Sequence, residues 1–139
     1  MYGYPVSAET YALFYNKAYI NPEEVPTTWD ELKEFAAKFN QENPGKFCFI
    51  MDVSSGYYTI IFTTSQGNRL FGPDGTDTVN TNINSPASVE GMKFFQGLRE
   101  ILDVPAADLT TSICDSAFMS GDAALYITGL WNVANFENA

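Results

Sequence analysis

Continuous apolar runs mark three short segments of the chain, at residues 11–15, 47–51 and 123–127. Runs of this length predict buried β-strands, and a run without polar interruptions is typical of a strand that is covered on both faces. The run at 47–51, Phe-Cys-Phe-Ile-Met, is continuously apolar, which is the pattern of a strand buried on both faces of a parallel sheet. The pattern therefore predicts three buried strands, spread over the length of the chain.

Between these runs, apolar residues recur at helical spacing. The best marked helix follows Thr28, because Thr28 and Glu31 form the sequence of a capping box, in which each side chain can bond to the other residue's backbone N–H. Trp29 and the apolar residues after it form one helix face, and Pro44 ends the helix. Further helices are predicted at 57–65 with Ser54-Ser55-Gly56 as turn and cap, from Ser85-Pro86 to about Leu102, at 112–120 with Ser112 as cap, and from about Trp131 onward.

The segment between the second and third of these helices contains the tight turn Gly72–Gly75, whose proline favours the turn. Its flanks, residues 69–71 and 79–83, are predicted to pair as a small hairpin. A calcium loop is rejected here, because the alternating carboxylates and the distal bidentate glutamate are missing.

Alternation of strands and helices predicts an α/β fold, with a mainly parallel sheet flanked by helices on its faces. In such sheets ligands bind beyond the carboxyl ends of the strands. Two strand-to-helix loops, 52–56 and 128–130, fall there, and each brings aromatic residues to the start of the next helix: Tyr57 and Tyr58 in the first, Trp131 in the second. Aromatic faces beside hydroxyls and amides suit a neutral, hydroxylated ligand such as a sugar. The alternative is that these rings only pack helices onto the sheet.

Glu9 lies before the first predicted strand, where a carboxylate can accept hydrogen bonds from two sugar hydroxyls. The alternative is a solvated surface acid. Glu9 and Asp52 are also the only acids near the predicted site, so a small carbohydrate-active hydrolase is a competing hypothesis, although nothing marks the two as a catalytic pair. A third hypothesis is a protein-interaction module whose exposed aromatics form an apolar patch.

Composition narrows these choices. The chain has 139 residues, enough for one domain, and no histidine, which excludes histidine-based triads and metal sites. A net charge of −10 opposes binding to nucleic acid or anionic membranes, and no apolar run is long enough to span a bilayer. No metal or cofactor motif occurs. Cys48 and Cys114 are expected to be free buried thiols, with a disulfide as the alternative.

The first residues, Met1–Pro5, lack the basic and apolar regions of a signal peptide. We therefore expect either a cytoplasmic protein or a piece of a longer chain.

Four segments together carry a resemblance to a known family. The segments are Tyr4–Lys17, Thr28–Leu32, Ala117–Leu125 and Thr128–Trp131, and their order and spacing resemble those of bacterial extracellular solute-binding proteins of the maltose-binding type. The resemblance extends over nearly the whole chain, and it implies two-lobed clamps that bind sugars between their lobes and deliver them to an ABC importer. On this basis residues 1–139 are a single lobe, the greater part of a carboxy-terminal lobe with a periplasmic-binding-protein-like fold.

The resemblance also implies roles for particular residues. Glu9 falls on the family's acidic sugar ligand, and Tyr57 and Trp131 fall on aromatics that stack on sugar rings, with Ser55 and Tyr58 beside them. The expected ligand is a maltose- or maltodextrin-like oligosaccharide. The expected partners are the missing amino-terminal lobe and the importer's membrane subunits. The parent protein is expected outside the cytoplasm, periplasmic or lipid-anchored, and not to be an enzyme. The chain departs from maltose binders at Ser55 and Gly56, where they carry glutamate and proline, and at Thr111, where an aromatic is expected.

Overall fold

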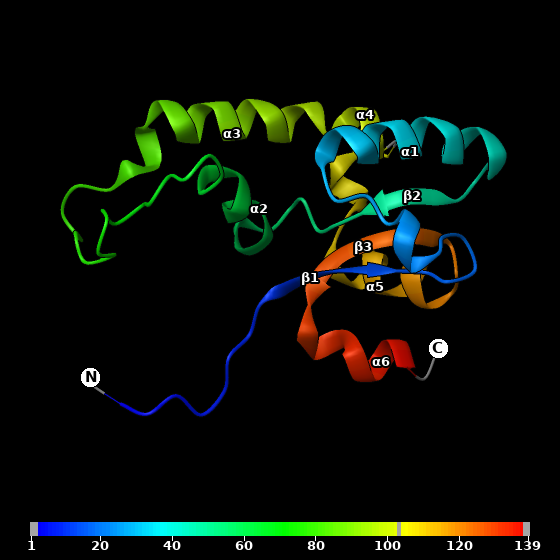
Figure 1. The fold of residues 1–139 in the computed structure, drawn as a ribbon, viewed down its shortest axis with the longest axis horizontal. Coiled ribbons are helices and arrows are strands. Elements are labelled where there is room, and N and C mark those ends of the chain that lie inside the picture. Colours follow the sequence, from blue (N-terminus) through cyan, green and yellow to red (C-terminus); the bar gives the residue numbers. More distant parts are fainter. Residues whose placement is uncertain (1–2, 103, 138–139) are drawn as a thin grey trace.

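One strand, β3 (Ala123–Gly129), lies between the other two strands of the sheet, β1 (Tyr11–Tyr15) and β2 (Phe47–Ile50) (Figure 1). The computed structural model describes residues 3–102 and 104–137. Within β3 the four residues from Ala123 to Tyr126 are fully buried. All three strands predicted from apolar runs are confirmed, and β3 extends two residues further than the run that predicted it.

The sheet is mixed, and this corrects the expectation of a mainly parallel one. β2 pairs with β3 in parallel, but β1 pairs with β3 antiparallel, with Tyr11 opposite Gly129 and Tyr15 opposite Leu125. Alternation of strands and helices gives parallel strands only where the helix between two strands is the single segment that carries the chain back. Here residues 16–28 first carry the chain back along the sheet, so that the following helix runs in the same direction as β1 and β2 then runs opposite to β1 (Figure 1). The α/β class itself is confirmed.

Helices cover both faces of this sheet. In Figure 1, α1 and α4 lie on one face and α5 and α6 on the other, while α2 and α3 pack against each other to one side. The α-helices are α1 (Trp29–Glu42), α2 (Gly56–Thr63), α3 (Pro86–Gly97), α4 (Arg99–Leu102), α5 (Thr111–Met119) and α6 (Val133–Glu137). Short 3-10 helices are η1 (Pro22–Glu24), η2 (Asn82–Asn84), η3 (Ala106–Asp108) and η4 (Leu130–Asn132).

The capping box at the start of α1 is confirmed. The Thr28 hydroxyl accepts the Glu31 N–H at 3.2 Å, and a Glu31 carboxylate oxygen accepts the Thr28 N–H at 3.1 Å. The same oxygen accepts the Thr27 N–H at 2.7 Å, so Glu31 satisfies donors that a helix start otherwise leaves unpaired. The predicted caps Ser55 and Ser85 are confirmed at α2 and α3, where their hydroxyls accept backbone N–H groups.

Two local expectations are wrong. Residues 69–71 and 79–83 form no hairpin; they run through turns linked by single backbone bonds such as that from the Asn82 N–H to the Leu70 carbonyl. The cap of α5 is Thr110 and not Ser112, because the helix begins at Thr111, so the capping position falls two residues earlier than predicted. The final predicted helix begins with η4 at Leu130, and its last two residues, 138 and 139, lie outside the described residues.

The core fills the space between the sheet and both helix layers. Cys48 and Cys114 are buried free thiols, as expected, and burial raises the pKa of each to about 12.

Among the described residues, no helix has the length and apolar character needed to cross a bilayer.

Trp29 packs against three phenylalanine rings on the face of the sheet that α1 covers. Its ring lies 6.0 Å from that of Phe49, 5.9 Å from Phe62 and 5.1 Å from Phe94, centroid to centroid. It therefore joins the sheet to α1, α2 and α3.

Replacing Trp29 should test this packing. Trp29→Ala leaves a cavity between three phenylalanines and should lower the free energy of unfolding by about 3 kcal/mol. Trp29→Phe, the matched control, keeps a ring and should lose less than half as much. Urea unfolding followed by circular dichroism measures both, and an unchanged midpoint for the alanine variant would show that the ring contributes nothing to the core.

Candidate functional site

Four aromatic rings meet where β3 ends. Tyr57 lies 5.3 Å from Tyr11, 5.4 Å from Tyr58 and 6.0 Å from Trp131, measured between ring centroids. Tyr57 and Trp131 are 53% and 41% exposed, whereas Tyr58 is only 5% exposed. We call these four residues the aromatic cluster. It presents two half-exposed rings to solvent and rests on a buried one.

The backbone brings the cluster together from three elements. Tyr11 opens β1 directly opposite Gly129, so it lies at the same end of the sheet as the turn that carries Trp131. Tyr57 and Tyr58 lie in the first turn of α2, which begins after the loop that follows β2. The Tyr11 hydroxyl donates to the Tyr57 backbone carbonyl and so ties β1 to α2. Burial, reinforced by the neighbouring Tyr57, raises the pKa of Tyr11, which keeps its phenol protonated as a donor.

A buried polar network lies beneath the rings. One Asp115 oxygen accepts the Tyr126 hydroxyl and the Asn132 side-chain amide, each at 2.8 Å. The same amide group contacts the Thr128 hydroxyl at 3.2 Å, and that hydroxyl lies 3.5 Å from the Tyr58 hydroxyl. Asn132 and Thr128 are 2% and 0% exposed. The network therefore links α5, the end of β3 and α2, with Asp115 half-buried.

Asp52 holds the other loop of the site. It is 4% exposed and accepts five hydrogen bonds. One oxygen accepts the Ser54 N–H and hydroxyl and the Ser55 N–H, and the other accepts the Thr111 N–H at 2.9 Å and hydroxyl at 2.6 Å. Burial alone raises the pKa of this carboxyl, but the hydrogen bonds, led by that of the Thr111 hydroxyl, outweigh burial and hold the pKa below its usual value.

The structure brings together three of the five predicted site residues. Tyr57, Tyr58 and Trp131 share the aromatic cluster, although Tyr58 supports the others from below. Ser55 caps α2 beside them, with its hydroxyl accepting the Tyr57 N–H at 3.3 Å. Glu9 lies in the exposed extended segment before β1, two residues from Tyr11, and is exposed.

In the structure, Asp52 is not available as the second acid that the hydrolase hypothesis requires. Both oxygens of Asp52 are occupied by protein donors, and the side chain is buried. A general acid in a glycosidase needs a raised pKa, whereas that of Asp52 is lowered. Asp52 is therefore a structural brace between the loop after β2 and the start of α5.

Sequence reasoning missed Tyr11 and Asn132 as members of the site. Tyr11 was assigned only to a strand, because nothing local reveals that β1 runs antiparallel to β3 and so begins beside Gly129. Asn132 follows Trp131 directly, and an amide in an otherwise apolar turn was the signal available for it. Thr111 was noted for the aromatic it replaces, and the structure assigns it to Asp52.

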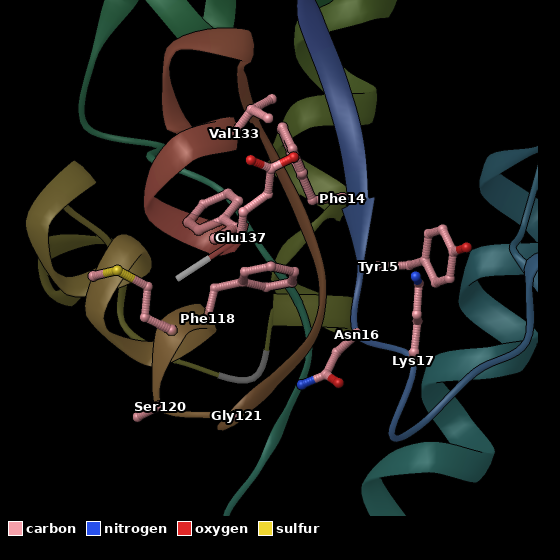
Figure 2. Close-up of a pocket in the computed structure, with 11 residues that line it drawn as sticks. Phe14, Tyr15, Asn16, Lys17, Phe118, Ser120, Gly121, Val133 and Glu137 are labelled. Carbon is pink, nitrogen blue, oxygen red and sulfur yellow. The ribbon is translucent and has the colours of Figure 1, made fainter. Parts of the chain in front are cut away.

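A pocket of about 610 Å³ lies elsewhere, between the carboxyl end of β1, the end of α5 and α6. Figure 2 shows Phe14 and Phe118 facing each other inside it, with Val133 and Glu137 above and Tyr15 pointing away. None of the five predicted site residues lines this pocket. Within residues 3–102 and 104–137, no group of three or more acidic, cysteine or histidine side chains is placed to hold a metal ion.

Comparison with known proteins connects this geometry to a family. A model described as bacterial extracellular solute-binding protein matches residues 1–139. The galactooligosaccharide-binding protein of Bacillus subtilis (strain 168) is 31% identical over 145 residues, covering 100% of this chain and 34% of that protein. The maltotriose-binding protein of Pyrococcus abyssi is 30% identical over 138 residues, covering 99% of this chain and 29% of that protein.

A solved structure gives the same result. The crystal structure of a cyclo/maltodextrin-binding protein complexed with maltotetraose matches with a TM-score of 0.78 and 30% identity, covering 94% of this chain and 34% of that one. The likeness confirms the expected periplasmic-binding-protein-like fold. The chain spans about a third of the length of these similar proteins.

Asp52→Asn should test whether the Asp52 hydrogen bonds stabilise the fold. Asparagine keeps one acceptor oxygen and loses the charge, so we expect a loss of about 2 kcal/mol in the free energy of unfolding at pH 7. Because the native pKa is lowered, the stabilisation is present above the unfolded pKa of about 3.9 and is lost as the pH falls through the native pKa.

The difference between wild type and variant should therefore shrink below pH ~3.9, measured by urea unfolding at pH 7 and at acid pH. Asp74→Asn, in an exposed turn, is the matched control and should change stability little at either pH. A difference between wild type and Asp52→Asn that is equal at both pH values would contradict the assignment.

Proposed function

Because the chain belongs to the family of bacterial extracellular solute-binding proteins, we propose that it is the sugar-binding part of an ABC transporter substrate-binding protein. The family assignment agrees with the resemblance carried by the four sequence segments. The proposed ligand is a maltose- or maltodextrin-like oligosaccharide. The names of similar proteins support this choice, since they bind galactooligosaccharide, maltotriose and cyclo/maltodextrin.

One observation carries the proposal: the half-exposed rings of Tyr57 and Trp131 lie 6.0 Å apart, in the first turn of α2 and in η4 just after β3. A sugar ring has an apolar C–H face that packs on an aromatic face, and its hydroxyls need polar partners at the edge. Each exposed ring rests on buried structure, Tyr57 on Tyr58 and Trp131 on the turn tied down by Asn132. Such rings are held in place before the ligand arrives, which reduces the entropy cost of binding.

Polar residues at the same end supply the hydrogen bonds in this proposal. Glu9 is exposed and lies two residues before Tyr11, so its carboxylate is free to accept two sugar hydroxyls. Ser55 uses its oxygen to cap α2, and its hydroxyl hydrogen remains available to a sugar oxygen. Asp52 takes no part in contacting sugar, because both its oxygens are occupied.

The proposed mechanism is closure of two lobes around the ligand. Residues 1–139 would form one lobe, the greater part of a carboxy-terminal lobe, and the missing amino-terminal lobe would close over the aromatic cluster. Sugar then stabilises the closed form by touching both lobes. The chain's share of about a third of its relatives' length is consistent with a partial lobe.

The remaining assignments follow from the family. We infer that the complete protein acts outside the cytoplasm, periplasmic or anchored as a lipoprotein, and passes its sugar to the membrane subunits of an importer. We also infer that it is not an enzyme: its similar proteins are named for binding, and the acid pair of the hydrolase hypothesis is not available.

Trp131→Ala in the complete protein tests the stacking role. Removing a ring that packs on sugar should cost about 2 kcal/mol of binding free energy, or about 30-fold in Kd for maltotriose. Titration calorimetry measures it, with Trp29→Phe as the control, since Trp29 lies in the core and should leave Kd unchanged. An unchanged Kd for Trp131→Ala would indicate that the ring only packs against the protein and does not contact sugar.

The chain alone should bind sugar weakly. With only one lobe, contacts from the opposite wall are lost, and we expect millimolar Kd or weaker for maltotriose, about 4 kcal/mol of binding free energy. Micromolar binding by residues 1–139 in a calorimetric titration would show that this part forms the whole site.

A further inference from the structure

Gly129 lies at the point where β3 turns toward α6, two residues before Trp131 (Figure 1). Its backbone angles, φ −90° and ψ 162°, are extended and open to any residue. The turn therefore does not need glycine for its backbone conformation, and the reason for glycine here lies in its missing side chain.

That missing side chain leaves room for the indole of Trp131. A Cβ on Gly129 would lie 1.9 Å from Cζ3, 2.0 Å from Cη2 and 2.3 Å from Cε3 of the Trp131 ring. Carbon atoms that are not bonded need about 3.5 Å or more. Three adjacent ring carbons thus occupy the space directly over the glycine Cα, and any side chain at 129 would force the indole to move.

The indole has a second neighbour in the aromatic cluster. The Tyr57 ring lies 6.0 Å from it at an angle of 51°. The backbone after Trp131 is held by the Asn132 amide, which bonds to Asp115 and Thr128. The indole therefore contacts both Gly129 and the Tyr57 ring and follows a hydrogen-bonded stretch of backbone, while 41% of the Trp131 surface remains exposed.

We propose that Gly129 is a positioning residue for sugar binding: its bare Cα sets the tilt of the Trp131 indole, and so the orientation of the face offered to the ligand. The proposal rests on the proposed function of Trp131 as a stacking residue. The glycine itself contacts no ligand and acts only through the indole. A methyl group at this position is enough to turn the ring toward Tyr57 or out into solvent.

The first test is Gly129→Ala in the complete protein, in a Trp29→Phe background. The chain has two tryptophans, so this background leaves Trp131 as the only one that the chain contributes. In the complete protein any tryptophan outside residues 1–139 is also replaced by phenylalanine. We expect a shifted emission maximum and an altered near-ultraviolet circular dichroism band without sugar, and Kd for maltotriose about tenfold weaker.

Gly97→Ala in the same background is the matched control. A Cβ on Gly97 meets no atom within 4 Å, so this substitution adds the same methyl group at a helix end far along the chain. It should leave emission, circular dichroism and Kd as they are. Far-ultraviolet circular dichroism and the thermal midpoint confirm that both variants are folded.

A double-mutant cycle with Trp131→Ala separates this inference from the proposed function. If the glycine acts through the indole, Gly129→Ala should weaken binding when Trp131 is present and change nothing further when it is alanine. Equal weakening in both backgrounds would overturn the inference, as would unchanged emission and Kd in Gly129→Ala. Unchanged Kd in Trp131→Ala alone would instead overturn the proposed function, while the emission shift would still test whether the glycine sets the position of the ring.

If Gly129→Ala does not fold, the double variant Gly129→Ala with Trp131→Leu removes the clash with the indole. Failure of this double variant to restore folding would overturn the inference.

Discussion

Burial of β3 is the constraint on which the rest of the fold depends. A strand with fully buried side chains on both faces needs a partner on each edge and a helix layer on each face, because unpaired backbone groups and exposed apolar surface are both costly. β1 and β2 supply the edges, and α1 with α4 and α5 with α6 supply the layers. Burial ends just after the strand, where Leu130 and Trp131 are 44% and 41% exposed, and the aromatic cluster lies at that boundary.

Two carboxylates, the buried Asp52 and the half-buried Asp115, organise this boundary. Asp52 gathers the loop after β2 and the first residue of α5, while Asp115 gathers Tyr126 and the turn that holds Asn132. Both oxygens of Asp52 and one oxygen of Asp115 accept hydrogen bonds from protein donors, and these bonds offset the cost of removing the charges from water. The exposed rings of Tyr57 and Trp131 therefore stand on a hydrogen-bonded base, which would suit the proposed binding of a neutral sugar.

Local signals in the sequence were enough to predict the strands, the capping box at Thr28 and most helices, because apolar runs and caps act over a few residues. Strand direction was not predictable in this way, since the extra reversal in residues 16–28 has no periodic pattern. The start of α5 was misplaced because Thr110, Thr111 and Ser112 are all suitable caps, and a distant carboxylate decides among them. In the site, Tyr57 and Trp131 were found from strand-end position, whereas Tyr11 depended on that unpredicted direction.

The two buried thiols make the order of events during folding matter. In the native chain Cys48 and Cys114 are 1% and 0% exposed, and the thiolate that an oxidant or disulfide must attack is almost absent at neutral pH. An unfolded chain has neither protection. A molecule that folds before it meets an oxidant keeps both sulfurs shielded for as long as it stays folded, whereas one that meets the oxidant first is open to crosslinks that the native structure does not contain.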